Sequence, residues 1–219
     1  MTDFEGFSAA ALDFYEDLED DNSRGFWAAH REVYEGEVRV PMVGLAAVLE
    51  DEFGPAKIFR PYRDVRFSKD KTPYKTHQGA FVRTADRTGL YVQIDAAGIR
   101  TGAGWYDADA EAKRRFRAAV VDNRSGRALE RLLAALEALG YAIDGDRVKT
   151  RPRGWDADHP RIGLLRHNTL NVGRHHGDPD WLRTSEAVEH VRRDWRAFAP
   201  LIAWHRKHVG TTAAPGPSR

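Results

Sequence analysis

The sequence predicts an α+β fold in which a central, mainly antiparallel sheet is packed by N-terminal, middle and C-terminal helices. Three parts of the sequence, which differ in the spacing of their apolar residues, predict this fold. Apolar residues follow a helical spacing over roughly the first 54 residues, alternate between about 57 and 106, and then return to a helical spacing. Since 42% of the 219 residues are hydrophobic, we expect a single globular domain over residues 1–208 and a disordered tail over 209–219.

The N-terminal part is expected to form three helices. Ser8 is placed to cap the first helix, and the second should begin at about Asn22 or Ser23. Because proline has no backbone N–H, Pro41 should mark a break before the third. The inward residues of the first and third helices are expected to be Leu12, Tyr15, Leu18, Met42, Leu45, Val48, Leu49 and Phe53.

Strands are expected where the apolar residues alternate. A short strand is predicted at 57–60, and two longer ones at 79–85 and 89–95. The polar residues between the longer strands are typical of a tight hairpin connection, which makes this pair antiparallel. Residues 99–106 are expected to add a further strand.

Helical spacing returns in the second half of the chain. A helix is expected over about 107–122, and the clearest helical stripe follows and ends at Gly140. A strand is expected at 169–173 and a last helix at about 179–208. The stripe consists of Leu129, Leu132, Leu133, Leu136 and Leu139.

Composition excludes several classes of protein. With 34 Lys+Arg and 33 Asp+Glu, the formal net charge of +1 argues against coating a nucleic acid or a membrane by bulk charge. The lack of cysteine excludes disulfides, thiolate metal sites and cysteine nucleophiles. No secretory leader and no run of about 18 apolar residues is found, so we expect no membrane partner and a cytoplasmic location.

The strongest functional signal is a basic window at residues 57–77. It carries seven Lys/Arg against two aspartates, and four of the seven lysines of the chain fall inside it. Pro61 and Pro73 oppose one long helix, so we expect a turn-rich segment that directs its cations toward one concavity. The candidate ligand-binding residues are Arg60, Arg63, Arg66, Lys69, Lys71, Tyr74 and Lys75.

These residue types suit an anion. Arginine grips phosphate or carboxylate through paired N–H groups, lysine acts as a point charge, and the interleaved Tyr62, Phe67 and Tyr74 suit stacking on a flat ring. The expected partner is an anionic small molecule or a nucleotide, and a nucleic acid remains an alternative. His77 is the candidate base, because neighbouring cations lower the pKa of an imidazole.

Other interpretations of the window stay open. Asp64 and Asp70 can tie several of its cations into ion pairs, which would make the window an internal salt-bridge network. The protein can equally be an enzyme that acts on a phosphorylated small molecule, a nucleic-acid-binding module, or a structural or interaction module. A structural role predicts that replacement of Arg63 lowers stability without loss of a ligand.

Four other motifs give weaker signals. Ser68 and Lys71 have the S-x-x-K spacing of serine acyltransferases, but Thr72 before Pro73 opposes the helix that this chemistry needs. The GAG at 102–104 lacks the third glycine of a dinucleotide fingerprint, so no cofactor is expected. The remaining weak signals are the aspartate pairs Asp107/Asp109 and Asp156/Asp158.

The histidines give no metal motif. Nine are present, and the densest group lies between residues 156 and 176, but none of that group has the spacing of helical metal ligands. His175 and His176 precede Gly177 and are interpreted as an exposed turn, and His30 as a residue at the edge of the core. We therefore expect no metal site.

Four segments together resemble a known family. They are RPYRDVRFSKDKTPYKTH (60–77), GLYVQI (89–94), GAGWYDAD (102–109) and RGWDADHP (153–160). They are similar to the signature blocks of a bacterial family of conserved hypothetical proteins, domain of unknown function 2461. The resemblance runs from about Phe7 to His208 and implies one intact domain of that family. It brings no activity, substrate or catalytic residue with it.

Overall fold

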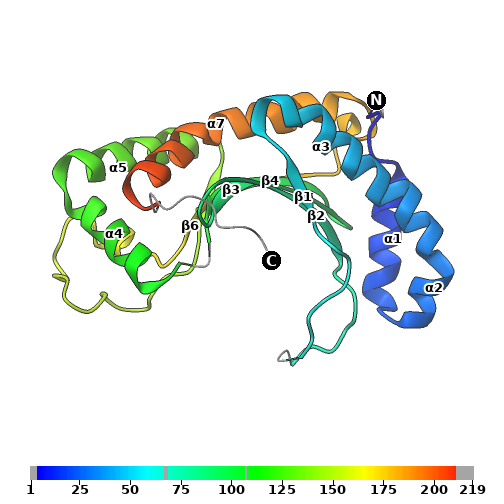
Figure 1. Ribbon diagram of the computed structural model, residues 1–219, viewed down its shortest axis with the longest axis horizontal. Helices are drawn as coiled ribbons and strands as arrows, with labels where there is room; N and C mark the ends of the chain where they lie inside the picture. The colour runs from blue at the N-terminus through cyan, green and yellow to red at the C-terminus, as the bar shows by residue number, and fades with distance from the viewer. Residues whose placement is uncertain (1–3, 67–68, 107, 211–219) are drawn as a thin grey trace. The chain divides into compact units, whose positions relative to one another are not determined.

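The computed structural model describes residues 4–66, 69–106 and 108–210 (Figure 1). The chain divides into two compact units. The first contains the described residues up to Val82 together with Tyr91–Thr101 and His175–Asp194, and the second contains Arg83–Leu90, Gly102–Arg174 and the residues from Trp195 onward. Most of the predicted tail, residues 211–219, lies outside the described part.

Six strands form one sheet in the order β1-β2-β3-β4-β6-β5, and the predicted α+β class is confirmed. β1 pairs with β2, and β5 with β6, in antiparallel register. The expected hairpin is present as β2 and β3. The strand bounds are β1 Ala56–Ile58, β2 His77–Ala85, β3 Thr88–Asp95, β4 Gly98–Trp105, β5 Ala142–Asp144 and β6 Leu170–Gly177. β5, three residues long, is the strand that alternation did not predict.

The N-terminal helices of the first unit are α1 (Ala9–Asp20), α2 (Arg24–Val33) and α3 (Val40–Phe53). Ser23 caps α2, since its side chain accepts a hydrogen bond from Phe26 N–H. Ser8 lies at the cap position of α1, but its hydroxyl donates to Glu37 Oε2 at 2.6 Å.

Pro41 does not interrupt the helical run. A π-helical turn, Tyr34–Arg39, joins α2 to α3, and Pro41 lies in the first turn of α3. Proline cannot donate a hydrogen bond, and its ring crowds the carbonyl four residues earlier. The wider turn, in which Val40 N–H donates to Glu35 O, precedes the proline and replaces the expected break.

The core of the first unit follows the predicted faces except at Phe53, which is half-buried, and at Val48. The expected inward residues of α1 are buried, as are Met42, Leu45 and Leu49 of α3. Val48 is 42% exposed and lies on the outer face of α3. Figure 1 shows α3 and the beginning of α7 (Glu186–His208) along the same side of the strands. The helices thus cover one face of the sheet in this unit.

The second unit contains the middle helices α4 (Ala110–Val121), α5 (Asn123–Ala138) and the short α6 (Ile162–Leu165). The predicted leucine stripe of α5 is buried at Leu129, Leu133 and Leu136. Leu139 is 61% exposed because the helix ends at Ala138. Arg161 is buried, and its guanidinium bonds Glu130 and the carbonyl of Val120.

A short 3-10 helix, η2 (Asp180–Arg183), leads into α7. Asp194 of α7 is fully buried, accepts a hydrogen bond from Thr101 Oγ1 at 2.6 Å, and contacts His176 Nε2 at 2.6 Å. The interpretation of His176 as an exposed turn residue is therefore wrong: it lies in β6 with a side chain 9% exposed. Mutual hydrogen bonding makes the burial of this polar cluster possible.

No helix in the described ranges has both the length and the apolar character that crossing a bilayer requires.

The Asp194 cluster should stabilise the fold more than a surface ion pair does. We expect Asp194→Asn to lower the free energy of unfolding by about 1–3 kcal/mol, because Thr101 and His176 lose a charged acceptor in a buried site. Asp178→Asn is the matched control. Asp178 pairs with Arg183 at the surface, with a side chain 41% exposed, so its loss should cost less than about 1 kcal/mol. Urea unfolding curves test the difference, and equal costs would contradict it.

His205 of α7 should make stability depend on pH. Its ring is fully buried, neither ring nitrogen has a hydrogen-bond partner among the described residues, and burial lowers its pKa from 6.5 to about 3. As the pH falls below 6.5, the unfolded chain takes up this proton before the folded protein does. Stability is therefore lost progressively between about pH 6.5 and pH 3.

Between pH 6.5 and pH 5 this single group should cost about 2 kcal/mol of unfolding free energy. We expect His205→Phe to remove that part of the pH dependence, as measured by urea unfolding at the two pH values. An unchanged slope in the variant would show that His205 does not carry it.

Candidate functional site

The basic window forms an arm that extends beyond β1 and β2 (residues 59–76, with 67 and 68 outside the described part; cyan in Figure 1). Its two sides are paired through backbone hydrogen bonds. Lys75 N–H donates to Pro61 O at 2.8 Å, and Arg63 N–H donates to Pro73 O at 2.9 Å. Each proline supplies a carbonyl but no N–H, so each pair has one bond where an ordinary antiparallel pair has two. The prolines thus allow the extended arm and oppose a helix.

The arm is held by contacts with the first two helices. Asn22, between α1 and α2, uses both ends of its amide on the backbone of Tyr74: Tyr74 N–H donates to Asn22 Oδ1 at 3.1 Å, and Asn22 Nδ2 donates to Tyr74 O at 3.0 Å. The ring of Tyr74 stacks on Trp27 of α2, with centroids 4.2 Å apart and planes within 7°. Tyr74 is only 5% exposed. Its ring therefore packs the arm onto α2.

Two of the candidate arginines are paired within the arm. Arg63 Nη1 donates to Asp70 at 2.5 Å and to Thr72 Oγ1 at 2.6 Å. Arg66 grips Asp64 with two bonds, Nε to Oδ1 at 2.9 Å and Nη2 to Oδ2 at 2.6 Å. Hydrogen bonds from Arg66 lower the pKa of the Asp64 carboxyl to about 2. The aspartates therefore neutralise part of the basic window, as the salt-bridge interpretation expects.

Other cations of the arm have no acidic partner among the described residues. Lys75 Nζ donates to the backbone carbonyl of Arg60 at 2.9 Å and lies 5.3 Å from the centroid of the Phe59 ring. Burial lowers the pKa of Lys75, and the charges of Arg60 and Lys57 lower it further. Lys71 donates to a backbone carbonyl at 3.0 Å, and the exposed Lys69 makes no ion pair within the described ranges. A surplus of positive charge remains around Lys75.

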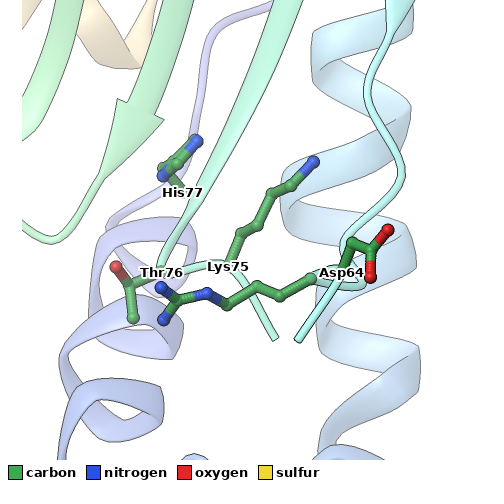
Figure 2. Close-up of a pocket in the computed structure, with 5 residues that line it drawn as sticks. Asp64, Lys75, Thr76 and His77 are labelled. Carbon is green, nitrogen blue, oxygen red and sulfur yellow. The ribbon is translucent and has the colours of Figure 1, made fainter. Parts of the chain in front are cut away.

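Lys75 borders an open cavity of about 380 Å³ at the base of the arm. The cavity is lined by Arg63, Asp64, Lys75, Thr76 and His77. Figure 2 draws the lining side chains as sticks and labels Asp64, Lys75, Thr76 and His77. Burial lowers the pKa of His77, and the Lys75 charge lowers it further. His77 is therefore neutral at pH 7. A neutral imidazole in this place can accept a proton or a hydrogen bond.

A polar row on β3 lies near the cavity and was not singled out from the sequence. Tyr91 Oη donates to Gln93 Oε1 at 2.7 Å, Gln93 Nε2 donates to Asp95 Oδ2 at 2.6 Å, and Asp95 Oδ1 accepts from Ala97 N–H at 2.9 Å. β3 is the neighbour of β2, whose first residue, His77, lines the cavity, and the charge of Asp95 raises the pKa of that histidine. The signal was available in the sequence, because polar side chains occupy every second position of this predicted strand.

The weaker candidates do not form a second site. Asp109 caps α4 by accepting from Ala112 N–H at 2.7 Å, and it pairs with Arg87 at 3.0 Å. His167 Nδ1 bonds the carbonyl of Thr169. Within the described ranges no three His, Asp or Glu side chains come together as metal ligands. Ser68, Phe67 and Asp107 lie outside the described residues.

The bond between Asn22 and Tyr74 can be tested at one amide. We expect Asn22→Ala to raise the hydrogen-exchange rate of Tyr74 N–H by about tenfold, since a hydrogen bond of this kind is worth about 1 kcal/mol. Glu19→Ala, at an exposed position of α1, is the control and should leave the exchange rate of Tyr74 N–H unchanged. Amide-resolved exchange measured by NMR checks this. Unchanged exchange at Tyr74 in the Asn22→Ala variant would mean that Asn22 does not hold the arm.

Comparison with known proteins identifies the family of the chain. The model of a family described as conserved hypothetical protein (DUF2461) matches residues 10–204, which include the arm, the cavity and the polar row. Among curated proteins no match was found. Since the family model covers most of the chain, the protein belongs to the DUF2461 family of conserved hypothetical proteins.

Proposed function

We propose that the protein binds a small phosphorylated or carboxylated ligand in the cavity lined by Arg63, Asp64, Lys75, Thr76 and His77, where Arg66 pairs with the Asp64 carboxylate. The observation that carries the proposal is the position of Lys75, a half-buried cation at a cavity, with no acidic partner among the described residues. Its ammonium donates one bond to the carbonyl of Arg60 and has two N–H groups left. An anion in the cavity would supply the missing negative charge.

Arg63 can add a directional contact. Both of its hydrogen bonds to the arm come from Nη1, so Nε and Nη2 have no acceptor in the part of the chain that the structure describes. Asp70 and Thr72 hold the guanidinium in place while these donors remain for a ligand. A guanidinium fixed in this way loses little side-chain entropy when it binds a phosphate or carboxylate. The salt bridge thus supports the binding role.

The size of the cavity favours a small molecule over a nucleic acid. A volume of about 380 Å³ is within the range of small-molecule sites. Nucleic-acid binding relies on an extended track of phosphate contacts. Arg60, Lys69 and Lys71 would then act by raising the local concentration of anions, and their direct participation stays a prediction. The family match across both units supports the further proposal that residues 1–208 form one domain.

The proposal predicts that Lys75→Gln weakens binding of inorganic phosphate by about tenfold, because a charge-assisted hydrogen bond is lost. Lys149→Gln makes the same change of charge at an exposed position in the second unit and should leave binding unaltered. Isothermal titration calorimetry at low ionic strength measures both. No phosphate binding by the wild-type protein, or an equal loss in the two variants, would overturn the proposal.

A second candidate role, chemistry on the bound ligand, is favoured by His77 alone. Its lowered pKa makes it a neutral base at pH 7, at the same cavity as the two cations. Protonation at lower pH would add a positive charge beside the ligand. By linkage, bound phosphate should therefore raise the pKa of His77, which an NMR titration of its ring protons with and without phosphate measures. The exposed His175 serves as the reference. Equal pKa values of His77 with and without phosphate would contradict contact between His77 and the phosphate.

A further inference from the structure

We infer that the anion cavity continues onto the sheet face that carries Phe59, Tyr91 and Arg100, and that this face holds a flat aromatic or heterocyclic ring of the ligand. The inference rests on the proposed function and narrows it. The ligand class would be an aromatic or heterocyclic phosphate or carboxylate. A phosphorylated polyol or an inorganic anion would fill only the cavity.

Contacts between neighbours lead from the cavity to this face. Lys75, which lines the cavity, has its Nζ 5.3 Å from the centroid of the Phe59 ring. The Phe59 and Tyr91 rings follow with centroids 6.2 Å apart, and Arg100 Cζ lies 5.9 Å from the Tyr91 centroid. Both rings are half-buried, and Arg100 is exposed. The result is a pair of neighbouring aromatic rings, each with a cation over it, a pattern that suits a flat anionic ligand.

The Tyr91 ring lies down on the sheet instead of standing away from it. A Cβ atom placed on Gly79 of β2 would be 2.4 Å from Tyr91 Oη and 2.7 Å from its Cε2, so the phenol ring occupies the space of the missing side chain. Any other residue at Gly79 would displace the ring. Tyr91 is half-buried in this position, so some of its surface stays accessible to solvent.

The polar row keeps this surface rigid and gives it direction. The hydrogen bonds from Tyr91 through Gln93 to Asp95 end at the backbone N–H of Ala97, which fixes the tyrosine before any ligand binds. Preorganisation of this kind lowers the entropic cost of binding. Asp95 repels a second anionic group and accepts hydrogen bonds, so the acidic group should lie at Lys75 and the ring, with any N–H or hydroxyl donors, nearer Asp95.

Three phosphates test the inference. We expect the wild-type protein to bind phenyl phosphate about five- to tenfold more tightly than glycerol 3-phosphate or inorganic phosphate, because only the first has a ring to stack. Phe59→Leu should remove most of this advantage and leave the affinity for the other two unchanged. Phe26→Leu makes the same change at a half-buried ring of α2 outside this face and is the matched control that should retain the preference. Calorimetry gives the affinities, and thermal unfolding shows whether each variant is folded.

The outcomes separate the two proposals. Equal affinity of the wild-type protein for phenyl phosphate and glycerol 3-phosphate would overturn the ring surface while leaving the anion cavity intact. No binding of any of the three would overturn both. If Phe59→Leu does not fold, saturation-transfer NMR on the wild-type protein tests the ring surface instead. Transfer to the phenyl protons that exceeds transfer to the glycerol protons supports the inference, and equal transfer overturns it.

Discussion

The anchoring of Tyr74 to the helices fixes the candidate site. The Asn22 amide pairs with the backbone of Tyr74, and the Tyr74 ring stacks on Trp27. The arm has no sheet of its own beyond single backbone bonds around its prolines. These contacts with the helices therefore set where its second side runs. Lys75, Thr76 and His77 follow Tyr74 directly, so the residue that is anchored determines the place of three residues that line the cavity.

The charge pattern of the window has two parts with different consequences. Arg63 and Arg66 are neutralised by aspartates of the arm itself, and this gives the arm a defined shape. Lys75 has a carbonyl and an aromatic ring as neighbours, and no acidic side chain among the described residues neutralises its charge. The salt-bridge interpretation therefore describes Arg63 and Arg66, the anion-site interpretation describes Lys75, and Arg63 belongs to both. The first explains how the arm is held, and the second is our proposal for what the arm does.

Local pattern was sufficient for five of the six described strands, the buried face of α5 and the position of the basic window, because each depends on residues close together in the chain. It was insufficient wherever a partner is distant in sequence. Tyr74 is a candidate ligand-binding residue in the sequence. In the structure its backbone bonds the side chain of Asn22, 52 residues away, and its ring packs on Trp27. His176 meets Asp194 across 18 residues, and neither neighbourhood shows this pairing. The polar row at Tyr91, Gln93 and Asp95 could be predicted from the sequence. Polar residues at every second position of a strand share one face, as apolar residues at that spacing do.

The central claim is that the base of the arm is an anion site, and a residue-resolved titration tests it most directly. Inorganic phosphate is added to the ¹⁵N-labelled protein, and the backbone amide shifts are followed by NMR. The account predicts saturable shifts that are largest at Lys75, Thr76 and His77, with smaller ones at Arg63. Shifts confined to other segments, or none at all up to high phosphate concentration, would contradict it.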